Sequence, residues 1–281
     1  MSRQLRVSES LVVSKTGWPG ESEDIVADGP AFLVVCDGAT DKSGLTFNGL
    51  SGGRVVAEIV CKVIAAAAAG TPGVELVRRI NLSYEERLGS KTRGREVGDL
   101  PAASFCAVDK IDRRVIRVGD CSWRSVERVE MGGKRVDEIS GDARAALLSS
   151  LLRSGVREEV LRADDPGRQM VLPLIRAQAF WRNNPEPGSL CHGAIDGRKV
   201  PDSFIEEWQL EDDEHELAVA SDGYPDLLMT LRESEDCLRQ DLLEDPLRIG
   251  RHRTTKGVMP GNLSFDDRAF VRLIDSAASQ S

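Results

Sequence analysis

The feature that most constrains this chain is an apolar run that ends in an aspartate. Residues 31–36 are apolar without interruption and lead into Asp37, and residues 217–220 are apolar and are followed by Ser221 and Asp222. Runs of this kind suit strands that are buried on both faces. The pattern therefore predicts strands of a buried sheet system, with a carboxylate standing where each strand stops.

Two further segments combine a strand pattern with an acid. Residues 115–118 precede Gly119 and Asp120, whereas Asp266 comes shortly before the apolar segment 268–274. We expect these acids to meet at one rim of the sheet system. Carboxylate oxygens are the ligands that hard cations such as Mg²⁺ and Mn²⁺ prefer. The sequence thus predicts a site for divalent cations at this rim.

The spacing of turns indicates the fold class. Short turns separate the apolar segments between residues 103 and 140, which favours antiparallel pairing over βαβ crossovers. Residues 55–64 carry one broad apolar helical face, and a second helix to about residue 88 is expected to fold back beside the first. We therefore expect an α+β sandwich with its helices outside, and not a doubly wound parallel sheet. Other expected elements are strands at 123–129, 135–139 and 204–210 and helices at 142–153 and 233–243.

Composition sets the domain count and excludes several functions. The chain has 281 residues, of which 41% are hydrophobic and 30% charged, as is usual for a soluble globular protein. We expect one domain over residues 1–281, with an irregular or partly helical insert at about 155–200. The net charge of −9 argues against a nucleic-acid-binding surface. No membrane span or signal sequence is visible, so we expect a cytoplasmic protein without a membrane partner.

The acidic segments, taken in chain order, resemble those of a known family. They are Ser22-Glu23-Asp24, Val35-Cys36-Asp37-Gly38, Val118-Gly119-Asp120-Cys121, Ala220-Ser221-Asp222-Gly223 and Ser264-Phe265-Asp266-Asp267. This order resembles the N-E-D, V-x-D-G, G-D-S, S-D-G and D-[ND] pattern of the metal-dependent protein phosphatase 2C family, the PPM-type serine/threonine phosphatases. The chain is similar to a divergent, bacterial-like member from about residue 10 to residue 274. The resemblance implies two stacked antiparallel β-sheets flanked by helix pairs, a four-layer αββα sandwich.

The resemblance also implies a role for each acid. Asp37 would bridge two metal ions, with the carbonyl of Gly38 as a further oxygen ligand. Asp222 and Asp266 would hold the first ion, and we expect these two together with Asp37 to be the catalytic residues.

Three more acids complete the implied metal centre. Glu23 would serve the second ion, directly or through water, and Asp24 would lie in its outer shell. Asp120 matches the aspartate that helps to bind a weaker third ion in some relatives. The implied cofactors are therefore two ions of Mg²⁺ or Mn²⁺, and the resemblance allows a weaker third.

The activity implied by the resemblance is hydrolysis of phosphoserine or phosphothreonine in proteins. A hydroxide that bridges two metal ions can attack phosphorus directly, without a phosphoenzyme. The implied partners are a phosphoprotein substrate and, in a signalling role, a cognate kinase. Residues 155–200 fall where relatives have a variable flap-like structure, so we expect this segment to govern substrate choice.

Departures from the family pattern leave alternatives open. Ala39 stands where some relatives carry a histidine, and the loop around Trp18 lacks the arginine that grips phosphate in many relatives. These changes motivate a second hypothesis, a catalytically weak phosphatase-like module that binds a phosphoprotein partner. Asp41 and Lys42 could act as an outer acid and a phosphate contact or be solvated loop residues. A haloacid-dehalogenase-like phosphatase is disfavoured because Val35 occupies the position of its nucleophilic aspartate.

Overall fold

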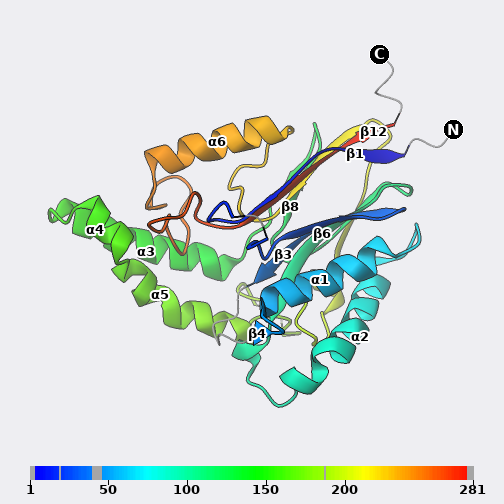
Figure 1. Ribbon diagram of the computed structural model, residues 1–281, viewed down its shortest axis with the longest axis horizontal. Coiled ribbons are helices and arrows are strands. Elements are labelled where there is room, and N and C mark those ends of the chain that lie inside the picture. Colours follow the sequence, from blue (N-terminus) through cyan, green and yellow to red (C-terminus); the bar gives the residue numbers. More distant parts are fainter. Residues whose placement is uncertain (1–3, 19, 40–45, 187, 277–281) are drawn as a thin grey trace.

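The computed structural model describes residues 4–18, 20–39, 46–186 and 188–276. Two β-sheets lie face to face at the centre, with helices on their outer sides (Figure 1). Asp41 and Lys42, which the sequence places beside Asp37, lie outside the described residues.

Both large sheets are five-stranded and antiparallel. The first sheet has the strand order β1-β12-β11-β8-β9, and the second has the order β10-β7-β6-β3-β2. The strands of the first sheet are β1 (Leu5–Val13), β8 (Ser122–Arg124), β9 (Val129–Glu130), β11 (Glu216–Ala220) and β12 (Arg268–Asp275). The strands of the second are β2 (Ile25–Asp28), β3 (Phe32–Ala39), β6 (Ala102–Asp109), β7 (Arg114–Val118) and β10 (Glu206–Gln209). A short hairpin, β4 (Thr46–Phe47) and β5 (Leu50–Ser51), precedes the first helix.

The alternation of side chains along β3 explains how the sheets stack. Leu33 and Val35 pack between the two sheets against residues such as Val219. Phe32 and Val34 point the other way, into the core under the first two helices. Because side chains alternate along a strand, Asp37 continues the face of Leu33 and Val35 and reaches the seam between the sheets.

Helices cover the outer face of each sheet. The outer face of the second sheet is covered by α1 (Gly52–Ala65) and α2 (Gly73–Thr92), which lie side by side (Figure 1). The outer face of the first sheet is covered by α6 (Leu231–Glu244), whose Leu238 belongs to the same buried cluster as Phe270 of β12. A further pair, α3 (Arg135–Arg153) and α5 (Pro166–Ala177), packs together beyond the sheets. The expected α+β sandwich of two stacked antiparallel sheets flanked by helices is confirmed.

Two predicted strands were wrong. The segment predicted as one strand over 123–129 is divided into β8 and β9, which pair with each other across a turn at 125–128. Residues 135–139 form the first turn of α3 instead of a strand. Val136, Ser140 and Arg144 are buried at intervals of four residues, which is the period of a helix packed on one face. The strand was predicted because the run follows the Gly132-Gly133 pair, which resembles a hairpin turn, whereas the spacing of Val136 and Ile139 is itself helical.

Residues 155–200 contain little regular structure besides two helices. They form α4 (Glu158–Ala163), α5 and a 3₁₀ turn at Gln178–Phe180. An isolated bridge from Ile195 to Ala103 ties the end of this segment to the start of β6. No helix in the described part of the chain is long and apolar enough to cross a membrane.

Candidate metal centre

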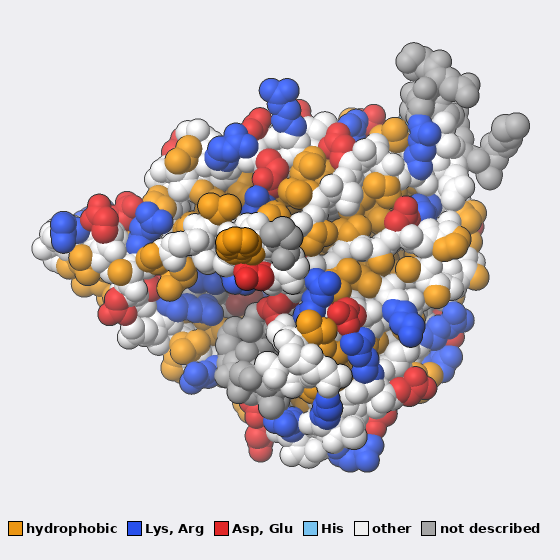
Figure 2. Space-filling view, viewed as in Figure 1, with side chains coloured by type: hydrophobic (Ala, Val, Ile, Leu, Met, Phe, Trp, Pro, Cys, Tyr) orange, Lys and Arg blue, Asp and Glu red, His pale blue; other side chains and the backbone are white. Residues whose placement is uncertain are grey.

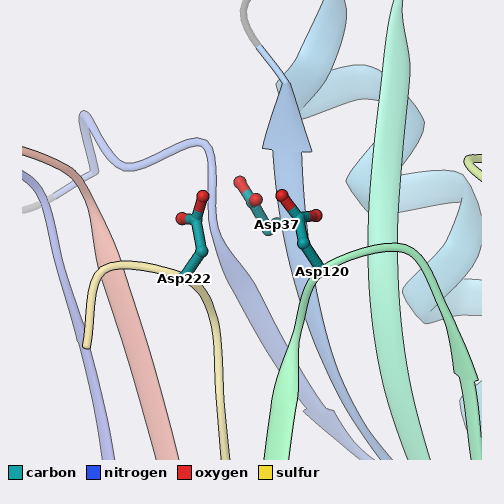
Figure 3. A group of neighbouring side chains, drawn as sticks. All are labelled: Asp37, Asp120 and Asp222. Carbon is teal, nitrogen blue, oxygen red and sulfur yellow. The ribbon is translucent and has the colours of Figure 1, made fainter. Parts of the chain in front are cut away.

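Three aspartates that are far apart in the sequence meet at one end of the sandwich. Asp37 lies in β3, Asp120 follows β7, and Asp222 follows β11. One carboxylate oxygen from each of them lies within 4.8 Å of those of the other two. Figure 3 shows the three carboxylates side by side at the ends of their strands. Both sheets therefore contribute to one cluster of oxygen ligands, of the kind that binds hard divalent cations.

A cavity of about 200 Å³ opens over this cluster. Acidic and basic side chains gather around a recess near the middle of this face (Figure 2). The residues that the sequence predicts for the site and that line the cavity are Glu23, Asp24, Asp37, Gly38, Asp222 and Asp266. The structure thus brings these predicted residues to one cavity, with Asp120 beside Asp37 and Asp222.

Asp24 is a buried residue next to the acidic cluster, directly before β2. The Ser221 hydroxyl donates a hydrogen bond of 2.6 Å to Asp24 Oδ2, and Ser221 Oγ accepts one of 2.8 Å from the N–H of Ala269. Burial raises the pKa of Asp24 well above its ordinary value, although the Ser221 hydrogen bond opposes the shift. This position suits a residue that supports the site from the outer shell.

Glu23 is fixed through its side chain and its backbone. Its carboxylate accepts a hydrogen bond from the hydroxyl of Ser51, the residue that also caps α1. Its N–H donates to Asp267 Oδ2 at 2.9 Å, and Asp267 forms an ion pair of 3.0 Å with Lys15. Asp267 was not predicted as a site residue, and its contacts show that it holds the loop that carries Glu23.

Two lysines that the sequence did not single out enter the site. Lys134 Nζ lies 2.6 Å from Asp120 Oδ2, and Lys256 Nζ lies 2.7 Å from Asp266 Oδ2. The other oxygen of Asp120 accepts a hydrogen bond of 2.5 Å from the Ser104 hydroxyl. Both of these predicted ligands therefore have a cationic partner within the protein.

Asp37 and Asp222 differ from these acids in their electrostatic surroundings. Neither carboxylate forms an ion pair with a lysine or arginine among the residues that the structure describes. Burial, followed by repulsion from Asp24 and Asp120, raises the pKa of Asp37 well above its ordinary value. For Asp120, burial acts in the same direction, but Lys134 and Ser104 outweigh it and lower the pKa. Lys134 attracts both carboxylates but does not outweigh burial and the neighbouring acids, so a divalent cation beside Asp37 and Asp222 would relieve the remaining repulsion.

Arginines also line the cavity. We use the name basic wall for Arg168 and Arg176 of α5; Arg182, which lines the cavity too, is already paired with Asp196 at 2.8 Å. Arg168 is oriented by a hydrogen bond of 3.0 Å from its Nη1 to the carbonyl oxygen of Thr255. Arginine forms bidentate contacts with phosphate, so this wall is chemically suited to a phosphorylated ligand.

The fold defines the class of protein that this chain resembles. It is an αββα sandwich with an acidic cluster at one end of the paired sheets. The serine/threonine phosphatase Stp1 from Staphylococcus aureus has this fold, with a TM-score of 0.50, 14% identity, and coverage of 98% of this chain and 97% of that chain.

Two further solved structures align along almost the whole chain. The Mycobacterium tuberculosis serine/threonine phosphatase PstP/Ppp aligns with a TM-score of 0.49 and 15% identity over 96% of this chain and 98% of that chain. A structure of the PstP catalytic domain with 2 manganese ions aligns at 0.48 and 14% over 97% and 98%. No protein-family model and no curated protein matches the sequence.

Proposed function

We propose that this chain is a Mg²⁺- or Mn²⁺-dependent phosphomonoester hydrolase that acts on phosphoserine or phosphothreonine in proteins. The observation that carries the proposal is the convergence of Asp37, Asp120 and Asp222, with oxygens within 4.8 Å of one another. The fold shared with the serine/threonine phosphatase Stp1 supports the proposal by analogy.

The residues around the cavity fit two hard cations. Asp37 and Asp222 would be the central ligands, with Glu23, Asp266 and the carbonyl of Gly38 contributing further oxygens. Bound ions would activate water as a nucleophile and neutralise charge that develops on phosphorus. Asp266 would have to exchange its contact with Lys256 for a metal, which leaves Lys256 as a cation at the edge of the site.

The basic wall supplies cations that the loop around Trp18 lacks. Arg176 is exposed and lines the cavity, so its guanidinium is available to a phosphate that enters from solvent. We propose that Arg168 and Arg176 orient the phosphoryl group while the acidic cluster holds the ions. The phosphoprotein substrate, a cognate kinase and a cytoplasmic location all form part of this proposal.

A second candidate function is a catalytically weak module that binds a phosphoprotein. The ion pairs Lys134–Asp120 and Lys256–Asp266 favour it, because each uses an acid that the resemblance assigns to a metal ion. The basic wall would then bind phosphate without turnover. The position of Asp37 and Asp222, which have no such lysine partner among the described residues, favours the enzyme.

One assay separates the two candidates. Hydrolysis of an aryl phosphate would be measured with Mn²⁺, after chelation, and in the variant Asp37→Asn. We expect both chelation and the variant to lower the rate about 100-fold or more, because a metal-activated water contributes several kcal/mol. The matched control is Asp112→Asn, an exposed aspartate in the turn between β6 and β7. Absence of turnover in wild type at millimolar Mn²⁺ contradicts the enzyme and supports the binding module.

A further inference from the structure

We infer that Lys134 is a built-in cation of the acidic cluster, and that its ammonium group occupies the place beside Asp120 that a third divalent ion would otherwise take. The inference rests on the proposed function, since it concerns how many ions the same site holds. It departs from the expectation that Asp120 is a metal ligand, which stays a prediction until ions are counted.

The geometry at Asp120 carries the inference. Lys134 Nζ lies 2.6 Å from Oδ2, while the Ser104 hydroxyl lies 2.5 Å from Oδ1. A divalent ion bound to a carboxylate sits about 2.0–2.6 Å from its oxygen, which is nearly the position of the ammonium nitrogen. Asp222 and Asp137 also attract the Lys134 charge. An ion shared by Asp120 and Asp222 would therefore have to displace the lysine.

The fold fixes Lys134 in this position. Gly132 passes so close to the strand end that a Cβ atom there would lie 2.1 Å from the carbonyl oxygen of Asp120. The N–H of Gly132 donates a hydrogen bond of 2.9 Å to Ser122 Oγ. Two residues later Lys134 stands immediately before α3, whose Val136 is fully buried. The turn at Gly132 and the start of α3 thus position Lys134 beside the acidic cluster.

Because the Lys134–Asp120 ion pair is largely buried, a divalent ion does not readily displace the lysine from Asp120. Side-chain exposure is 15% for Lys134 and 4% for Asp120. Removing one partner of a buried ion pair leaves an uncompensated charge, which is strongly unfavourable. Because the lysine already balances Asp120, a divalent ion gains less there than at Asp37 and Asp222. We therefore expect the wild-type chain to bind ions at the two-ion site only.

The test counts bound Mn²⁺ by isothermal titration calorimetry, with free Mn²⁺ measured by electron paramagnetic resonance. The variants are Lys134→Met, Asp120→Asn and the double variant. The matched control is Lys110→Met, which removes a lysine that is 8% exposed and paired with Asp28 at the opposite end of β3. Thermal melts with and without Mn²⁺ give a second measure of binding.

We expect Lys134→Met to bind one more ion per chain than wild type and to gain more thermal stability from Mn²⁺. The double variant should lose this extra ion, because Asp120 is its ligand. Asp120→Asn alone should bind as many ions as wild type, and this result does not depend on whether Lys134→Met folds. A lower ion count in Asp120→Asn, or an unchanged count in Lys134→Met, overturns the inference.

The same titration distinguishes this inference from the proposed function. If only Lys134→Met binds Mn²⁺, the role of the lysine is supported and the two-ion hydrolase is contradicted. If neither wild type nor Lys134→Met binds Mn²⁺, both proposals are wrong. An ion in wild type that survives Asp120→Asn supports both.

Discussion

The hydroxyl of Ser221 donates a hydrogen bond of 2.6 Å to the carboxylate of Asp24, and this contact joins the two sheets at the acidic cluster. Ser221 follows β11 in the first sheet, whereas Asp24 precedes β2 in the second. Both residues are at most 2% exposed, so water does not compete for the bond. The residues that flank this pair, Glu23 and Asp222, are both predicted metal ligands, so the bond sets their relative position.

We expect Ser221→Ala to lower both stability and metal affinity. The variant leaves the buried carboxylate of Asp24 without its hydroxyl donor, and a lost partner of this kind costs about 1–3 kcal/mol. Urea denaturation would measure the loss, and a Mn²⁺ titration would measure the change in affinity. Ser10→Ala, at an exposed position in β1, is the control. Equal stability of the two variants would show that the bond does not join the sheets.

The metal-free chain should lose stability as the pH rises above about 4. The pKa values of Asp37 and Asp24 are raised above the ordinary 3.8 mainly by burial, so the folded state binds more protons than the unfolded state above that pH. As the pH rises from the ordinary pKa towards the raised folded-state pKa, each of these carboxylates lowers the free energy of unfolding. Above the folded-state pKa there is no further loss. The pKa of Asp120 is lowered, so Asp120 stabilises the fold above pH 3.8. This contribution to the free energy of unfolding is lost as the pH falls below 3.8.

Asp37→Asn isolates this effect. Without the Asp37 carboxylate, the free energy of unfolding of the metal-free chain should fall less steeply with pH, and its value at pH 7 should exceed that of wild type. Chemical denaturation at several pH values, with chelator present, measures both. Saturating Mn²⁺ should stabilise wild type, by about 2.7 kcal/mol at 100 times the dissociation constant, and the variant less. A slope identical to that of wild type would contradict the account of Asp37.

Gly53→Ala should disturb the site from the start of α1. A Cβ atom at Gly53 would lie 2.7 Å from the carbonyl oxygen of Ala39 and 2.8 Å from the carbonyl carbon of Gly38. Relief of such overpacking costs about 1–3 kcal/mol and would move Gly38, a predicted metal ligand. Thermal melts and Mn²⁺ titration measure the two effects. Gly98→Ala, where a Cβ meets nothing within 4 Å, should melt like wild type, and an equally small change in Gly53→Ala would be evidence against the close approach.

Arg176→Gln tests the basic wall. If Arg176 binds the phosphoryl group, the variant should raise KM for an aryl phosphate roughly 10- to 150-fold, because a charge-assisted hydrogen bond contributes roughly 1.5–3 kcal/mol. Steady-state kinetics would separate this from an effect on kcat. Arg153→Gln, at the exposed end of α3, serves as the control. An unchanged KM in Arg176→Gln would contradict a role of Arg176 in substrate binding.

The local patterns around the aspartates were sufficient to predict the fold and the centre of the site. The uninterrupted apolar run before Asp37 predicted a strand that is buried on both faces and ends in a carboxylate, and β3 has this burial pattern. Which face carries Asp37 is seen only in the structure. Short turns predicted antiparallel sheets, which the structure confirms. The prediction that acids at strand ends meet at one rim is confirmed for Asp37, Asp120 and Asp222.

Contacts that depend on tertiary packing could not be predicted in this way. Lys134 follows a glycine pair that resembles a hairpin turn, and the short run after it was assigned to a strand, so the lysine was not placed at the rim. Lys256 and Arg168 lie in segments without a repeated pattern, and only the folded chain brings them to the cavity. The one available signal for Lys134 was the helical spacing of Val136 and Ser140.

The central claim is that Asp37 and Asp222, from different sheets, hold divalent ions together. Crystals grown with Mn²⁺ test it most directly, through anomalous scattering measured near the manganese absorption edge. We predict an anomalous peak between these two carboxylates, within about 2.0–2.6 Å of an oxygen from each. A well-ordered site without anomalous density between Asp37 and Asp222 would contradict the account.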